Sequence, residues 1–227
     1  MYGYSDSTGL NRQRELRASN LPGAFAAMGI SLGLTGAISW WASFLPGIAA
    51  WFWPLIIVQF GLILAIGTVR SWSKNADNLS LVLLFVYAGV TGLVLAPIAS
   101  IYLASSVGQG ILLKALVSAG ATFAAGAIYG WTTKKDLSNW GSILFMALLG
   151  IIISSLLNIF LLKSPVTDLV ISWITVIVFT AFTAFDLNMA RDNRFNQTAG
   201  QIALNLYLDF LNLFLAFLRI FGGSSRD

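Results

Sequence analysis

The stretch LNLYLDFLNLFLAFLRIF, residues 204–221, decides the fold class of this chain. Leu, Ile and Phe supply twelve of its eighteen residues. Together they favour insertion into a bilayer by roughly 4–7 kcal/mol, whereas a central Asp opposes it by about 3 kcal/mol. The segment is therefore predicted to cross a membrane, although it carries a carboxylate, Asp209, near its middle.

The composition of the whole chain agrees with a membrane location. Its 227 residues are 57% hydrophobic and 10% charged, and the mean hydropathy is +0.81. A soluble domain averages about 25% charged residues. We therefore expect an integral membrane protein whose constant partner is the lipid bilayer. The net charge of +4 is too small to indicate a nucleic-acid partner.

Two residue types are missing from the sequence, and their absence excludes several classes of site. Without Cys there is no thiolate nucleophile or thiolate metal site, and without His there is no Ser–His catalysis or His-ligated metal. The only Glu is Glu15, near the N-terminus. Acid–base or cation chemistry inside the membrane must therefore use aspartates, and we expect no resident cofactor.

Apolar runs of about the length that a membrane-spanning helix needs recur seven times along the chain. They cover residues 22–44, 49–69, 79–103, 109–131, 139–162, 167–189 and 200–221. We predict an all-α integral membrane protein, a seven-transmembrane-helix bundle over residues 22–222. A cytoplasmic N-terminal tail (1–21) precedes it and a short C-terminal tail (223–227) follows it.

The basic residues predict the orientation of the bundle. Nine of them fall on one side, namely Arg12, Arg14, Arg17, Arg70, Lys74, Lys134, Lys135, Arg191 and Arg194. Four fall on the other side, namely Lys114, Lys163, Arg219 and Arg226. Because cytoplasmic loops carry the excess of Lys and Arg, we expect a cytoplasmic N-terminus in a bacterial plasma (inner) membrane.

A polar stripe follows the last predicted helix. Steps of 4, 4, 3, 4 and 3 residues place its members on one helical face, namely Gln201, Asn205, Asp209, Asn212, Ala216 and Arg219. Lipid cannot satisfy such a stripe, so the last helix should be central, with Gln201, Asn205, Asn212 and Arg219 as candidates to line a pore. The alternative is a structural stripe that joins helices by hydrogen bonds.

The sixth predicted helix carries a matching carboxylate. Asp186 precedes Asp209 by 23 residues, so a symmetric turn near residues 195–197 would place both aspartates at the same depth. Asp186 shares a face with three hydroxyl residues, namely Ser172, Thr175 and Thr183.

Two carboxylates about 4 Å apart repel by roughly 4 kcal/mol at an effective dielectric constant of 20. Asp186 and Asp209 would then share one proton and could sense pH. Their oxygen atoms could also bind a hard cation such as Ca²⁺. In the alternative interpretation, Asp186 lies at an interface and pairs with Arg70, Arg191 or Arg194.

Several stretches resemble the Bax inhibitor-1 family, the transmembrane Bax inhibitor motif proteins, in a bacterial version. They are YAGVTGLVLAPI (87–98), YGWTTKKDLSNWGSILFMALLGIIISSLLNIF (129–160), TAFTAFD (180–186) and LNLYLDFLNLFLAFLRIFG (204–222). The resemblance implies seven helices with the last one buried centrally. It also implies a pH-sensitive calcium leak controlled by an aspartate pair, here Asp186 and Asp209, with Arg70 as a latch onto Asp186.

The chain departs from the family pattern at two places. The second predicted helix has no acidic residue, and Gln59 is its main polar group, so a further carboxylate ligand is missing there. The connector between the sixth and seventh helices is short and ends in Asn-Gln-Thr-Ala-Gly. Both departures concern cation affinity and gating rather than the fold.

The sequence thus favours a pH-sensitive calcium leak channel over two alternatives. One is a membrane-embedded modulator of another membrane protein, for example a quality-control protease. The other is an intramembrane aspartyl protease, which also uses two aspartates on neighbouring helices. Its YD, GxGD and PAL motifs do not match AFD and LYLD here, and no PAL follows. We therefore expect no enzymatic activity.

Overall fold

The computed structural model describes residues 20–192 and 195–223. Its helices are α2 (Asn20–Ala42), α3 (Phe52–Trp72), α4 (Ala76–Leu103), α5 (Ser106–Thr132), α6 (Trp140–Leu157), α7 (Pro165–Arg191) and α8 (Ala199–Gly223). All seven spans in the described part of the chain are long and apolar enough to cross a membrane, which confirms the predicted fold class. The predicted tails, 1–21 and 223–227, lie almost wholly outside the described residues.

Two short irregular helices accompany these spans. A 3₁₀ turn (Ile48–Trp51) leads into α3, and a π-helical turn (Asn158–Leu162) follows α6. The side chain of Asn158 turns the chain towards α7: its amide donates to the Ser164 carbonyl oxygen at 3.2 Å, and its oxygen accepts from the Ser164 N–H at 3.0 Å.

The start of α8 is fixed by a reciprocal cap. The Thr198 hydroxyl oxygen accepts from the Gln201 N–H at 3.1 Å, and the Gln201 side-chain oxygen accepts from the Thr198 N–H at 2.9 Å. This capping box satisfies two donors that a helix start leaves free. The amide group of Gln201 also donates to the carbonyl oxygens of Ile66 and Gly67 at 3.0 Å each, so the cap fastens α8 to α3.

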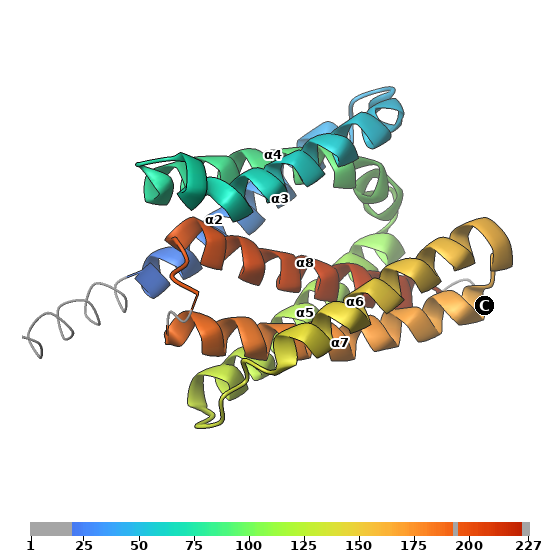
Figure 1. Cartoon of the computed structure of the whole chain (residues 1–227). Coiled ribbons are helices and arrows are strands. Elements are labelled where there is room, and N and C mark those ends of the chain that lie inside the picture. Colours follow the sequence, from blue (N-terminus) through green and yellow to red (C-terminus); the bar gives the residue numbers. More distant parts are fainter. Residues whose placement is uncertain (1–19, 193–194, 224–227) are drawn as a thin grey trace, which may run out of the picture.

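Helix α8 is the central helix of the bundle (Figure 1). It packs against α2, α4, α5 and α7 and touches α3. In its most apolar window 56% of the residues are buried, against 17% for the α3 span and 11% for the α6 span. The polar stripe on α8 predicted this central position, because lipid could not have satisfied it.

The other six helices form two units of three, one on each side of α8 (Figure 1). In the first unit α4 packs against both α2 and α3, and in the second unit α7 packs against both α5 and α6. Helix α4 therefore lies in the middle of the first unit, and α7 lies in the middle of the second, although each is the last of its three helices in the sequence. Because each unit has an odd number of spans, the two units cross the membrane in opposite directions, as inverted repeats do.

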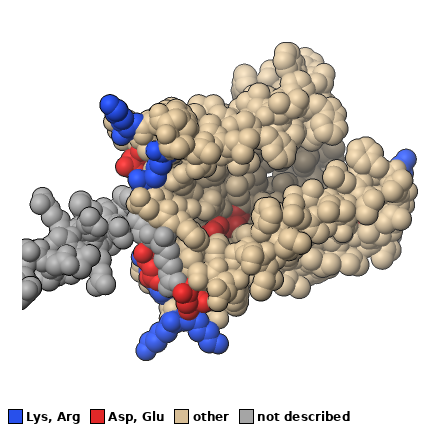
Figure 2. All heavy atoms as spheres, in the orientation of Figure 1, with Lys and Arg blue, Asp and Glu red and all other residues tan. Residues whose placement is uncertain are grey.

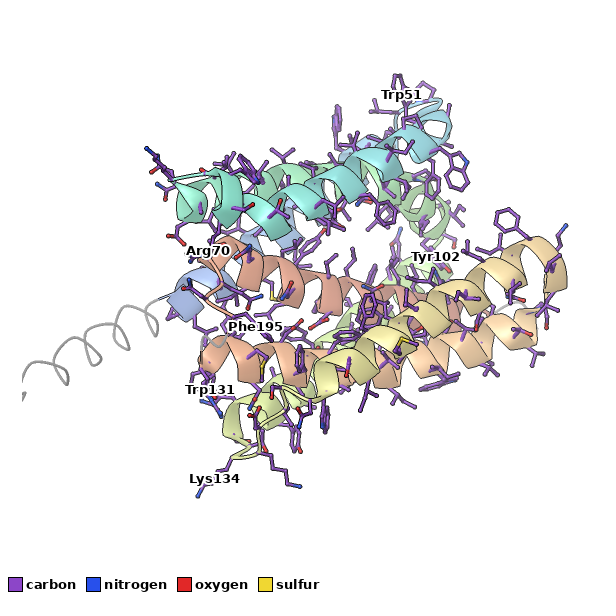
Figure 3. All side chains as sticks on the ribbon, viewed as in Figure 1. Trp51, Arg70, Tyr102, Trp131, Lys134 and Phe195 are labelled. Carbon is purple, nitrogen blue, oxygen red and sulfur yellow. The ribbon has the colours of Figure 1, made fainter. Side chains whose placement is uncertain are left out.

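Most of the charged side chains visible in Figure 2 gather at one end of the bundle, and a single basic residue is seen at the opposite end. We call this the basic end and define it by Arg70, Lys74, Lys134, Lys135 and Arg191. In Figure 3 the labelled Arg70, Trp131, Lys134 and Phe195 lie at this end, whereas Trp51 and Tyr102 lie at the opposite one.

The connector between α5 and α6 is tied to α7 at the basic end. The buried Asn188 amide donates to the carbonyl oxygen of Gly130 at 3.2 Å, and its oxygen accepts from the Leu137 N–H at 3.4 Å. Arg191 donates to the carbonyl oxygens of Trp131 and Thr133 at 2.7 and 3.0 Å. These hydrogen bonds hold the YGWTTKKDLS stretch, residues 129–138, against α7 in the second unit.

Candidate functional site

The structure brings Asp186 of α7 and Asp209 of α8 together in the middle of the bundle. Their carboxyl groups interact directly, and the hydroxyl of Thr183 also interacts with Asp209. Thr183 lies one turn before Asp186 on α7, and its hydroxyl is 2.8 Å from the carbonyl oxygen of Phe179. The two aspartates are thus neighbours at one depth, whereas their roles in pH sensing and ion gating stay predictions.

Burial limits the protonation states in which the two aspartates can be in contact. Asp209 is only 3% exposed, and its Oδ2 atom has no hydrogen-bond donor among the described residues. A buried carboxylate oxygen without a donor is costly, and so is a second negative charge beside it. Because carboxylates are acceptors only, a hydrogen bond between two carboxyl groups requires a proton on one of them. The arrangement therefore fits a pair that holds one proton.

The pair can be reached from one side of the molecule. Asp186 is half-buried, in contrast to Asp209. Figure 2 shows acidic atoms in a hollow between the two units, separate from the charged residues of the basic end. A proton or cation that enters this hollow would therefore meet acidic oxygen atoms in the middle of the membrane-spanning region.

The oxygen atoms available to a cation are few. Within residues 20–192 and 195–223, no group of three or more acidic residues gathers at this or any other place. Asp186 and Asp209 offer four carboxylate oxygens, and Thr183 adds a hydroxyl. Calcium takes six to eight oxygen ligands, so the pair alone fits an ion in passage better than one that is held tightly.

The arginines proposed as partners of Asp186 pair elsewhere in this structure. Arg70 lies 3.5 Å from Asp77, and both side chains are exposed at the basic end. Arg191 forms an ion pair with the adjacent Asp192 at 2.9 Å. Arg194, the third candidate, lies outside the described residues. The Arg70 latch onto Asp186 remains a prediction about another state of the protein.

A polar cavity of about 530 Å³ opens at the basic end, between the end of α3 and the start of α8. Arg70, Gln201 and Asn205 line it. Asn205 lies one turn before Asp209 on α8, so the lining of this cavity ends one helical turn from the aspartate pair. Two of the four residues that were predicted to line a pore, Gln201 and Asn205, therefore line this cavity.

The other members of the stripe have different surroundings. The Asn212 amide donates to the carbonyl oxygen of Leu208 in its own helix at 2.8 Å. Ala216 is buried, and Arg219 is exposed near the end of α8. The stripe thus lines the polar cavity at its start and meets Asp186 at its centre. The pore-lining roles of Asn212 and Arg219 stay predictions.

A second buried polar cluster lies on the opposite side of α8, and sequence reasoning missed it. The Tyr207 hydroxyl is 2.8 Å from the Thr35 hydroxyl, which donates to the Ala88 carbonyl oxygen at 2.9 Å. The Tyr207 ring packs edge-on against Tyr87, with centroids 5.9 Å apart. Tyr207 therefore joins α8 to the first unit, as Asp209 joins it to the second.

Gln59, noted in the sequence as the main polar group of the second span, belongs beside this cluster. Its amide donates to the Thr91 hydroxyl at 2.7 Å, and Thr91 donates to the Tyr87 carbonyl oxygen at 2.8 Å. The sequence contained one indication that Tyr207 matters, namely that it lies two residues before Asp209. Helical spacing puts it on another face, but spacing alone does not identify the hydroxyl groups opposite.

Comparisons with known proteins agree with the resemblance. The family model described as "Bax1-I: Inhibitor of apoptosis-promoting Bax1" matches residues 17–226. The inner membrane protein YbhL of Escherichia coli K12 is 37% identical over 212 residues, which cover 86% of this chain and 87% of that protein. An uncharacterized protein of Borreliella burgdorferi is 37% identical over 185 residues, covering 78% and 76% of the two chains.

Proposed function

Because the chain belongs to the Bax inhibitor-1 family, we propose that it is a pH-sensitive calcium leak channel gated by Asp186 and Asp209. One observation supports this proposal above the others. A pair of carboxyl groups lies between the central helix and α7, and one oxygen atom of the buried Asp209 has no donor among the described residues. In this proposal the pair holds and releases a proton and catalyses no reaction, so the protein is not an enzyme.

The proposed gate works by charge repulsion. With one shared proton, the two carboxyl groups attract each other and hold α7 against α8. When that proton leaves, two negative charges face each other at a depth where water is scarce. At about 4 Å they repel by roughly 4 kcal/mol, which is enough to change a closed-to-open ratio about a thousandfold. Flux should therefore rise as pH rises.

The proposed cation path follows from the same geometry. In this proposal the ion passes from the polar cavity at the basic end, which Gln201 and Asn205 line, to the aspartate pair one helical turn further along α8. Two ionised carboxylates would attract a divalent cation there, and too few ligands would surround it for tight binding. Calcium is thus the proposed transported ion rather than a resident cofactor.

Calcium flux into liposomes that hold only the purified protein tests the proposed function. We expect Ca²⁺ entry that is absent from protein-free liposomes and that increases between about pH 5 and pH 9. Protein in the liposomes that passes no Ca²⁺ at any pH would contradict the leak. It would favour the alternative role as a membrane-embedded modulator of another membrane protein.

We propose that the basic end faces the cytoplasm of a bacterium, with the protein in the inner membrane. The excess of basic residues at this end is the physical reason. The relative from Escherichia coli is named an inner membrane protein.

This orientation predicts which connectors an impermeant thiol reagent can reach on intact cells. The chain has no Cys, so a single introduced thiol reports its own position. Asn75→Cys, in the exposed connector between α3 and α4, should stay unlabelled, whereas Ala104→Cys at the opposite end should be labelled. The reverse labelling pattern would invert the proposed topology.

We propose that Arg70 is a latch that exchanges Asp77 for Asp186 when Asp186 loses the shared proton, which gives a second closed state. Arg70→Ala should raise the basal Ca²⁺ leak, because the closed state loses a cation that would otherwise neutralise Asp186. Asp77→Asn should have the opposite effect, since it frees Arg70 from its present partner. Both variants are measured in the liposome assay, and a flux equal to that of the wild type in both would exclude the latch.

A further inference from the structure

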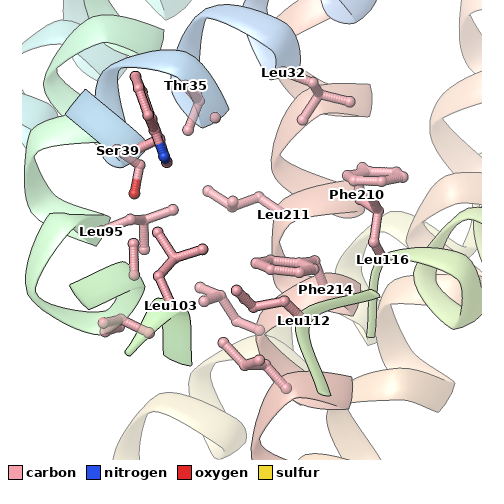
Figure 4. A pocket seen from close by; sticks show the side chains of 16 residues that line it. Leu32, Thr35, Ser39, Leu95, Leu103, Leu112, Leu116, Phe210, Leu211 and Phe214 are labelled. Carbon is pink, nitrogen blue, oxygen red and sulfur yellow. The ribbon is translucent and has the colours of Figure 1, made fainter. Parts of the chain in front are cut away.

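A second cavity, of about 260 Å³, lies between α2, α4, α5 and α8 (Figure 4). Its lining is almost wholly apolar, and only Thr35, Ser39 and Trp40 contribute polar side-chain groups. The Thr35 hydroxyl is already bonded to Ala88 and Tyr207, so it offers little to a polar ligand. The cavity is distinct from the polar one at the basic end.

The cavity runs along the central helix in the half of the bundle away from the basic end. On α8 its lining begins at Phe210, next to Asp209, and continues to Leu218. At a rise of 1.5 Å per residue this stretch is about 12 Å long. Phe210 and Phe214 project into the space from α8, opposite Leu95 and Leu103 of α4 (Figure 4).

The packing of the helices explains why this space exists. Helices α2 and α5 both pack against α8 but do not pack closely against each other. Phe210, Leu211 and Phe214 therefore remain partly exposed, although they belong to the most buried helix of the bundle. Large apolar side chains in the middle of a bundle are normally covered, so these residues indicate an apolar occupant.

The cavity opens towards the lipid-facing surface. Two of its lining residues, Trp40 of α2 and Leu116 of α5, are 58% and 49% exposed. Leu116 lies ten residues inside α5, where a membrane-spanning bundle is surrounded by hydrocarbon, whereas Trp40 lies in the last turn of α2. An acyl chain of the bilayer can thus reach the cavity without crossing a polar region.

We propose that this cavity binds an acyl chain of a membrane phospholipid. An apolar cavity of about 150 Å³ stays dry and accepts apolar ligands, so water is a poor occupant of this larger one. A helix of a partner protein, about 10 Å across with its side chains, is too wide. The bound chain packs against α8 beside Asp209 and separates the aspartate pair from this end of the bundle.

A phosphatidylethanolamine that carries a diazirine in its acyl chain tests the proposal in liposomes that hold the whole protein. Photolysis releases N₂, and the resulting carbene inserts into a neighbouring C–H bond. Peptide mapping should place adducts on residues 210–218. This readout requires no ion flux, so it is independent of the proposed function.

A cavity-filling variant and a matched control make the test specific. A Cβ added at Gly36, which lines the cavity, meets no atom within 4 Å, and the same holds for Gly33, which does not line it. Gly36→Leu should reduce labelling of residues 210–218 at least fivefold, whereas Gly33→Leu, in the same helix, should label like the wild type. Ala99→Leu fills the space from α4 and should act like Gly36→Leu.

Thermal unfolding in detergent first confirms that each variant is folded. Equal labelling of residues 210–218 in the folded Gly36→Leu, Ala99→Leu and Gly33→Leu proteins would overturn the proposal, because the chain would then not occupy the cavity. A wild type in which these residues carry no adducts would overturn it as well.

Discussion

Asp209→Asn should abolish the pH dependence of Ca²⁺ flux between about pH 5 and pH 9, or move its midpoint by up to about 3 pH units. The structural reason is the direct contact between Asp209 and Asp186 in a buried site. Asparagine has nearly the same shape but cannot ionise, so the repulsion between two carboxylates disappears. About 4 kcal/mol of repulsion corresponds to about 3 pH units.

Asp186→Asn should have the same effect, because either substitution leaves a single carboxyl group. The double variant should resemble each single variant instead of showing the sum of the two effects, since contacting residues in one unit are not additive. Flux measurements on all four proteins in liposomes test this expectation.

Asp168→Asn is the matched control. It removes a carboxyl group from the first turn of the same helix, 18 residues before Asp186 and therefore about 27 Å from it. Its pH profile should equal that of the wild type. Additive effects of the two central substitutions, or an unchanged profile in either one, would show that Asp186 and Asp209 are not one site.

The number and extent of the helices could be predicted because each span is a long apolar run. The expected last span, 200–221, and the observed Ala199–Gly223 differ by at most two residues at either end. The π-helical turn after α6 was missed, since Asn158 looks like an ordinary polar residue near a helix end. Its hydrogen bonds to Ser164 depend on how α6 and α7 turn, which no periodicity encodes.

The pairing of the aspartates could be anticipated from their equal distance to the turn between α7 and α8. The grouping of the six outer helices could not be anticipated from the sequence, because nearly all their faces are apolar. Contacts with lipid and contacts with other helices favour the same residues. The Tyr207 cluster and the cavity beside Phe210 and Phe214 depend on that grouping. A cavity in particular is a property of imperfect packing between helices, and a sequence pattern carries no trace of it.

Gly126 and Gly130 of α5 have the GxxxG spacing that is typical of close helix packing, and the structure shows what they pack against. A Cβ built on Gly126 would lie 2.8 Å from the Thr180 carbonyl oxygen, and one built on Gly130 would overlap the backbone of Ala184. Both contacts lie on α7, within six residues of Asp186. The close approach of α5 therefore fixes the part of α7 that carries the aspartate.

Gly130→Ala should consequently destabilise the protein by roughly 1–3 kcal/mol, because the added methyl group meets backbone that cannot rotate away. Gly120→Ala is the matched control in the same helix, since a Cβ there meets no atom within 4 Å. It should be neutral or stabilising by up to about 1 kcal/mol, as alanine favours a helix over glycine.

Thermal unfolding in detergent compares the stability of the two variants. The liposome assay then shows whether the position of the aspartate site also changes. If α5 positions α7, the Gly130→Ala protein should also show an altered pH profile of Ca²⁺ flux, whereas Gly120→Ala should not. Equal stability of the two variants would mean that α5 and α7 can separate at no cost. Asp186 would then owe its position to the other two neighbours of α7, namely α6 and α8.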